Sequence, residues 1–247
     1  MHDLIDTRHL HRYDHIIIHC AATRADQVEV DAAWIDRVHK DRGWRGCGYH
    51  VVITRGGDVQ TRKGGHLARP LNQPGAHVGD CGPGWNVRAL GICLAGGIDN
   101  RGRPEENFTD DQELALSELL RTLLLLHPAR RTAPPRIIGH RDLIRETGAP
   151  PKACPCFDVG DFLIAHAITP RRPVRRPEMP QEQYTSLPRD EGGSELLLTP
   201  AYHTVEEGDT YWRIARAYGI PLAKLARLNG LAYPSSKIQI GQRIRLT

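Results

Sequence analysis

The sequence predicts an α/β (α+β) fold, with a mixed central β-sheet flanked by helices, followed by a small βααβ module. Two observations lead to this prediction. Over the first 168 residues, short apolar runs of strand type alternate with segments of helical periodicity. A proline-rich stretch then separates these signals from a second, shorter set.

The first strand is predicted at 15–20, where three isoleucines stand between two histidines. A helix is expected over 31–42, because apolar residues recur at helical spacing until Gly43. Residues 49–54 and 59–62 are typical of two strands joined by a tight turn. They predict a hairpin.

A further buried strand is predicted at 89–97. Thr109 begins the longest helix, since Gln112 stands where a capping box requires it and an apolar leucine stripe follows. A last short strand at 136–140 and a last helix at 159–167 complete the expected sheet and its flanking helices.

The chain is expected to divide into a domain over 1–168, a linker over 169–200 and a module over 201–247. The linker holds six prolines and no sustained apolar period. The module has signals for a helix beginning at Asp209 or Thr210, a second short helix and a closing strand.

Charge and hydropathy exclude several classes of protein. The net charge is +4, and the whole excess lies in the last 47 residues, which argues against nucleic-acid binding. The first fifteen residues lack the apolar core of a signal peptide, and the longest leucine-rich run is too short to span a bilayer. We therefore expect synthesis in the cytoplasm and no membrane insertion. The six cysteines are then expected to be buried thiols, ligands or nucleophiles more often than disulfides.

Two histidines and one cysteine suggest a metal site. His19 and His140 each end an apolar strand-like run, so both imidazoles could meet at one edge of the sheet. Cys154 lies in "KACP", where we expect the proline to keep the chain extended and the sulfur exposed. Two imidazoles and one thiolate suit zinc and leave a fourth position for water. Cys156 is a possible second sulfur ligand, and a nucleophilic cysteine remains an alternative to a metal.

Residues 14–165 resemble the zinc-dependent N-acetylmuramoyl-L-alanine amidases, the superfamily of phage lysozyme-type amidases and peptidoglycan recognition proteins. The resemblance rests on the motifs "IIIHCAATR", "GYHVVITRGGDV", "GAHVG", "ALGICLAGGID", "FTDDQ", "GHRDL" and "PKACPCFD". It implies zinc on His19, His140 and Cys154, with Tyr49 and Lys152 as catalytic partners. It further implies that His77 lies on the cleft wall near the substrate.

Amide hydrolysis gives these residues distinct tasks. Zinc lowers the pKa of bound water to about 7 and polarises the carbonyl. Lys152, two positions before Cys154, is expected to stabilise the oxyanion, and Tyr49 to hydrogen-bond the attacking water. Strand alternation directs His50 away from Tyr49, so we assign His50 to structure. The four other cysteines, Cys20, Cys47, Cys81 and Cys93, are expected to be buried thiols.

Residues 201–247 resemble a LysM domain through "YHTVEEGDTYWRIARAYGI", "LNGL" and "IGQRIRL". Such modules bind glycans that contain N-acetylglucosamine. The resemblance places the binding groove at Gly208, Asp209, Thr210, Tyr211 and Ile240. Tyr211 replaces the usual leucine, and it either stacks on a sugar or fills the core.

These features predict a monomeric, endolysin-like peptidoglycan hydrolase. It would cut the amide between N-acetylmuramic acid and L-alanine in a muropeptide, while the LysM domain tethers it to the wall. It would reach the wall after release or lysis. Two alternatives are a non-catalytic recognition protein on the same scaffold and a cysteine hydrolase that uses Cys154 or Cys20.

Overall fold

A computed structural model describes residues 1–128 and 133–168, which form one α/β unit, and parts of the last segment. In that segment the described residues are 201–206, 209, 214–215, 217–218, 220, 224–225, 228–230 and 238–247. The predicted linker at 169–200 lies outside the described residues. The two described units are treated separately below.

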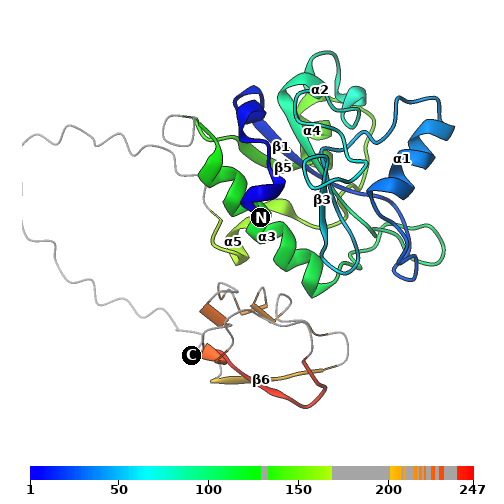
Figure 1. Cartoon of the computed structure of the whole chain (residues 1–247). Helices are drawn as coiled ribbons and strands as arrows, with labels where there is room; N and C mark the ends of the chain where they lie inside the picture. Colours follow the sequence, from blue (N-terminus) through cyan, green and yellow to red (C-terminus); the bar gives the residue numbers. More distant parts are fainter. Residues whose placement is uncertain are drawn as a thin grey trace, which may run out of the picture.

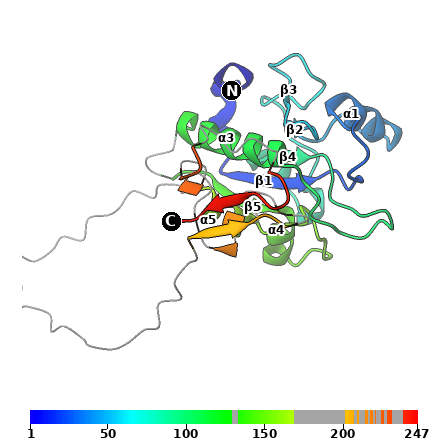
Figure 2. The same ribbon diagram turned by 90° about the horizontal axis from the view of Figure 1, so that it is seen from below.

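The larger unit is built on a five-stranded sheet in the order β3-β2-β4-β1-β5, which Figure 2 shows from one side to the other. The strands are β1 (His15–Cys20), β2 (Val51–Ile53), β3 (Val59–Thr61), β4 (Ala89–Leu94) and β5 (Arg136–Gly139). β1 pairs in parallel with both β4 and β5, and β2 pairs in parallel with β4. β3 returns antiparallel to β2 as the predicted hairpin. The predicted mixed α/β sheet is therefore confirmed.

Five helices flank this sheet: α1 (Ala32–Asp41), α2 (Trp85–Arg88), α3 (Asp110–Leu126), α4 (His140–Thr147) and α5 (Val159–Ala165). Short 3₁₀ turns add His2–Leu4, Thr7–Arg12 and Gly79–Cys81. The predicted capping box is present, because the Thr109 hydroxyl accepts from the Gln112 backbone and the Gln112 side chain accepts from the Thr109 backbone, each at 3.2 Å. The sequence did not predict α4, which begins at His140.

The two faces of the sheet have different coverings. Ile16 and Ile18 of β1 pack in one core cluster with the leucines of α3 and with Phe162 of α5. Ile17, which alternates to the opposite face, packs against Leu143 and Ile144 of α4. Figure 1 shows α3 and α5 below the sheet and α2 and α4 above it. His19 follows Ile17 by two positions, so its side chain belongs to the α4 face.

The N-terminal segment belongs to the core, although its alternating charges gave no strand or helix signal. Ile5, Leu10 and Tyr13 are almost fully buried in the cluster that contains α3. The Thr61 hydroxyl donates to the carbonyl of Leu4 at 2.7 Å, which ties this segment to β3. The segment therefore covers the hairpin side of the sheet.

His50 is a buried structural histidine beside β2, in agreement with its predicted role. Its Nδ1 accepts the backbone N–H of Gly91 at 3.0 Å, and its Nε2 lies 3.1 Å from the carbonyl of Gln73. Burial lowers the pKa of His50 to about 4. The unfolded chain has an ordinary histidine pKa of about 6.5, so between pH 6.5 and 4 only the unfolded state takes up this proton.

Acid is therefore expected to destabilise the unit through His50. The free energy of unfolding should fall as the pH decreases from 6.5 towards 4, by on the order of 1 kcal/mol per pH unit for this group. In the variant His50→Asn, an amide oxygen can accept from Gly91 without titrating. Urea unfolding at pH 7 and pH 5 should show a smaller difference for the variant than for the parent. Equal differences would mean that His50 does not carry the effect.

The smaller unit pairs β6 (Tyr202–Thr204) antiparallel with β7 (Arg243–Arg245). It has its own apolar cluster, made by Val205, Ile214, Ala215, Ile220, Leu225, Ile244 and Leu246. Its two predicted helices fall largely outside the described residues. Within the described parts of the chain, none of the helices has both the length and the apolar character needed to cross a bilayer.

Candidate active site

The three predicted metal ligands come together at one place. His19 is the fifth residue of β1, and His140 is the first residue of α4, directly after β5. Because β1 and β5 are parallel neighbours, their carboxyl ends bring the two imidazoles together, with ring centroids 4.6 Å apart. One ligand atom from each of His19, His140 and Cys154 lies within 4.8 Å of the others.

Cys154 reaches this place on a turn, and the expected extended segment is wrong. The backbone N–H of Cys156 donates to the carbonyl of Ala153 at 2.7 Å, which closes the turn and leaves Cys154 half-buried. The Arg141 N–H at the start of α4 donates to the Cys154 carbonyl at 2.7 Å. The Cys20 N–H donates to the Cys154 sulfur at 3.3 Å. Backbone donors from β1 and α4 therefore hold the cysteine.

Gly139, the last residue of β5, allows this approach. A Cβ at position 139 would lie 2.8 Å from Cδ of Pro155, which is closer than side chains tolerate. The turn that carries Cys154 therefore packs directly over the end of β5.

The two histidines are held in the form that binds metals. Burial lowers the pKa of His19 well below its ordinary value, and the neighbouring His77 and His140 add to the effect. Burial also lowers the pKa of His140, although Asp80 opposes the shift. Both rings are therefore neutral at pH 7 and have a lone pair to offer. Two neutral imidazoles and a thiol are a donor set that fits zinc.

Lys152 contacts the site through Asp80, a residue that no sequence motif indicated. The Lys152 ammonium lies 2.6 Å from one Asp80 oxygen, and the other oxygen lies 3.1 Å from Nε2 of His140. Burial would raise the pKa of Asp80, but Lys152 and His140 outweigh burial and lower it. Asp80 lies in the 3₁₀ turn Gly79–Cys81, whose position in space the sequence did not indicate.

Tyr49 lies two positions before β2, on the same side of the sheet as His19. Its ring centroid is 5.1 Å from that of His19 and 6.1 Å from that of His77. Burial raises the pKa of Tyr49 well above its ordinary value, so the phenol keeps its proton at neutral pH. The phenol is therefore a hydrogen-bond donor, and its ring lies next to that of the predicted ligand His19.

His77 is buried beside His19. Its Nδ1 lies 2.9 Å from Nε2 of His19, and its Nε2 lies 3.2 Å from the carbonyl of Ala89. Both ring nitrogens therefore have hydrogen-bond partners within the protein. The sequence had led us to expect a contact with substrate.

The other cysteines match their predicted character. Cys20, Cys47, Cys81 and Cys93 are buried. Cys156, the possible second sulfur ligand, is half-buried, lies 3.7 Å from the Cys20 sulfur and donates to the carbonyl of Gly97 at 3.1 Å. It faces Cys20 and Gly97, and it is not among the three clustered ligands.

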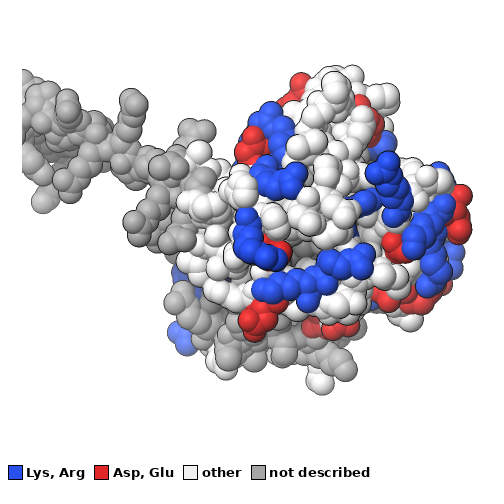
Figure 3. Space-filling model, turned by 45° about the horizontal axis from the view of Figure 1, so that its top comes forward, with Lys and Arg blue, Asp and Glu red and all other residues white. Residues whose placement is uncertain are grey.

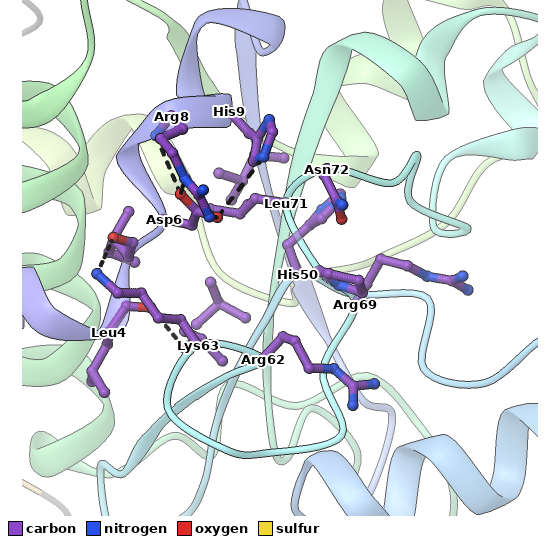
Figure 4. Close-up of a pocket in the computed structure, with 15 residues that line it drawn as sticks. Leu4, Asp6, Arg8, His9, His50, Arg62, Lys63, Arg69, Leu71 and Asn72 are labelled. Atoms are coloured by element: carbon purple, nitrogen blue, oxygen red, sulfur yellow. Dashed lines mark hydrogen bonds and ion pairs between the residues drawn. The ribbon is translucent and has the colours of Figure 1, made fainter.

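A separate pocket lies between the N-terminal segment and the hairpin (Figure 4). Most of the charged residues in its lining are cationic: Arg8, Arg62, Lys63 and Arg69, against Asp6. Three of these side chains have partners: Arg8 pairs with Asp6 at 2.9 Å, Lys63 donates to the carbonyl of Ile5 at 3.0 Å, and Arg62 donates to the carbonyl of Ala68 at 3.2 Å. None of the three clustered ligands lines it.

Comparison with known proteins identifies the fold that carries this site. Residues 9–157 match the N-acetylmuramoyl-L-alanine amidase family. The chain belongs to this family. Residues 203–247 match the LysM domain. The protein is a peptidoglycan hydrolase, with an amidase domain that contains His19, His140 and Cys154 and a LysM domain over residues 203–247.

Curated relatives include phage endolysins. The chain is 38% identical over 143 residues to the endolysin of Enterobacteria phage K11, a match that covers 58% of this chain and 80% of the relative. It is 35% identical over 146 residues to the endolysin of Escherichia phage T7, covering 59% and 82%. A solved amidase endolysin from Clostridium intestinale URNW is 24% identical, with a TM-score of 0.45, and covers 63% of this chain and 84% of that one.

Two residues of the predicted LysM groove can be placed. Asp209 is directed inward, with its carboxylate 2.6 Å from Nε2 of His203 and accepting the Glu206 N–H at 2.8 Å. Ile240 is 73% exposed. Gly208, Thr210 and Tyr211 lie outside the described residues.

Proposed function

We propose that the amidase domain is zinc-dependent and hydrolyses the amide between N-acetylmuramic acid and L-alanine of peptidoglycan. The observation that carries this proposal is the cluster of His19, His140 and Cys154, which joins two neutral imidazoles and a thiol within 4.8 Å. Zinc bound there would supply a water nucleophile at neutral pH and polarise the scissile carbonyl.

The chain's own residues then complete the chemistry. Lys152 is the cation that stabilises the oxyanion. To do so, its ammonium either leaves Asp80 or contacts Asp80 and the oxyanion together. The protonated Tyr49, beside His19, donates a hydrogen bond at the reacting centre and orients the nucleophile. Asp80 holds Lys152 and His140 in the correct relation before substrate binds.

The LysM domain is proposed to bind N-acetylglucosamine-containing glycan, with residues 169–200 as a tether between it and a catalytic domain over 1–168. A tether raises the local concentration of substrate and adds no catalytic contact. On the face of the larger unit shown in Figure 3, Lys and Arg side chains lie across the surface, with Asp and Glu mostly towards its edges. We further propose that the protein acts as a monomer on the wall after release from the cell.

The products of digestion test the proposed bond. Mass spectrometry of digested peptidoglycan should find free stem peptides with new L-alanine amino termini. Intact muropeptides would indicate a non-catalytic recognition protein. Activity that survives a zinc chelator would favour a cysteine hydrolase, because Cys154 lies 3.6 Å from Nδ1 of His19.

Truncation tests the modular arrangement. A chain that ends near Thr169 should hydrolyse small soluble muropeptides at the parent rate, because the clustered ligands all precede that point. It should bind whole cell walls less well, as measured by sedimentation with purified sacculi. Loss of both properties, with the circular dichroism of a folded sheet retained, would mean that the LysM domain helps to form the catalytic site.

A further inference from the structure

We infer that His77 is a positioning residue for the metal centre: it fixes the tautomer of His19, so that His19 offers its Nδ1 lone pair to the metal. This inference rests on the proposed zinc site and adds a residue to it. His77 contacts His19 from behind, and its role is therefore distinct from that of a ligand or a substrate contact.

The hydrogen bonds determine where the protons lie. The Ala89 carbonyl can only accept, so Nε2 of His77, 3.2 Å away, carries a proton. In a neutral ring the other nitrogen, Nδ1, is then an acceptor. It lies 2.9 Å from Nε2 of His19, which must donate. The remaining lone pair of His19 is on Nδ1, the atom that faces the Cys154 sulfur at 3.6 Å.

The backbone packs closely around the His77 ring. A Cβ at Gly75 would lie 2.4 Å from the ring, and one at Gly91 on β4 would lie 2.7 Å from it. The backbone N–H of His77 donates to the Asn86 side chain at 2.9 Å. Two close glycines and a backbone anchor therefore set the ring orientation, as an outer partner of a metal ligand requires.

Two variants separate the hydrogen bond from packing. His77→Leu removes the acceptor, whereas His77→Asn places an amide oxygen near the position of Nδ1. The affinity for Zn²⁺, measured by competition with a chromophoric chelator, should fall about 10- to 100-fold in the leucine variant and recover largely in the asparagine variant. The Co²⁺ absorption spectrum should change in the leucine variant only. Parent-like Zn²⁺ affinity in the leucine variant, or equal loss in both variants, would overturn the inference.

A third variant displaces the ring without changing it. Gly91→Ala should also weaken Zn²⁺ binding, because the added methyl group would collide with His77. Gly56→Ala is the control, since a Cβ there meets nothing within 4 Å. If the parent itself binds no Zn²⁺, the proposed function fails. If the parent binds Zn²⁺ and these variants match it, only the role of His77 fails.

Discussion

Replacing Cys154 with serine is expected to remove both zinc and amidase activity. A serine hydroxyl is not ionised at neutral pH and is a poor ligand for a borderline-soft metal ion, whereas a thiolate is a strong one. The two remaining imidazoles would leave the ion with too few protein ligands. Purified Cys154→Ser should therefore contain far less than one zinc per chain by elemental analysis, and it should release no stem peptides.

Cys156→Ser is the matched control, because Cys156 lies on the same turn and is half-buried like Cys154. Its sulfur faces Cys20 and Gly97, so this variant should keep both zinc and turnover. Stoichiometric zinc and normal turnover in Cys154→Ser would show that Cys154 is not a ligand. Loss of zinc in Cys156→Ser alone would assign the metal to the other sulfur.

Replacing Lys152 with alanine is expected to lower kcat with little change in KM. In the proposed mechanism the ammonium stabilises charge that develops only in the transition state, so its removal should leave substrate binding intact. Loss of such a stabiliser costs about 3–4 kcal/mol, or on the order of a hundredfold to a thousandfold in rate. Zinc content should stay at the parent level. Lys152→Arg keeps the charge but changes its shape and reach, so partial recovery at best is expected.

Lys40→Ala is the control for Lys152, because Lys40 is also an exposed lysine in an ion pair, with Asp36 at 2.7 Å. It lies on α1, and its removal should leave kcat unchanged. If Lys152→Ala shows the parent kcat at saturating substrate, Lys152 has no part in the mechanism. If KM rises while kcat stays at the parent value, Lys152 binds substrate and does not stabilise the transition state.

The strands were predictable because each is a short apolar run, and α3 because it carries a capping box and a leucine stripe. The helix α4 was missed because the prolines and glycine that follow His140 suggested an interrupted segment. In the structure the helix ends at Thr147, and Gly148 provides the left-handed cap before the prolines begin. The N-terminal 3₁₀ turns were missed because their few apolar residues form no local pattern and are buried only by tertiary contacts.

The clustered ligands were predictable from the motifs that carry them, whereas their partners were not. Asp80 and the buried position of His77 depend on how the loop before α2 folds over β4. That path is set by close contacts, such as the ring of His77 against Gly91, and no local pattern encodes it. The motifs therefore indicated the three residues that meet in the structure, but they did not indicate which residues orient them.

The ligands differ in how firmly the fold holds them. His19 belongs to β1, which is hydrogen-bonded to β4 along its whole length and to β5 over most of it. Cys154 depends on one turn and a few backbone donors. Segments with fewer buried contacts open at lower free energy than the sheet does. If the proposed zinc is bound, inactivation during storage would begin with local opening of this turn and loss of the ion while the sheet is still folded. Substitutions that stabilise the turn would then prolong activity more than substitutions in the core.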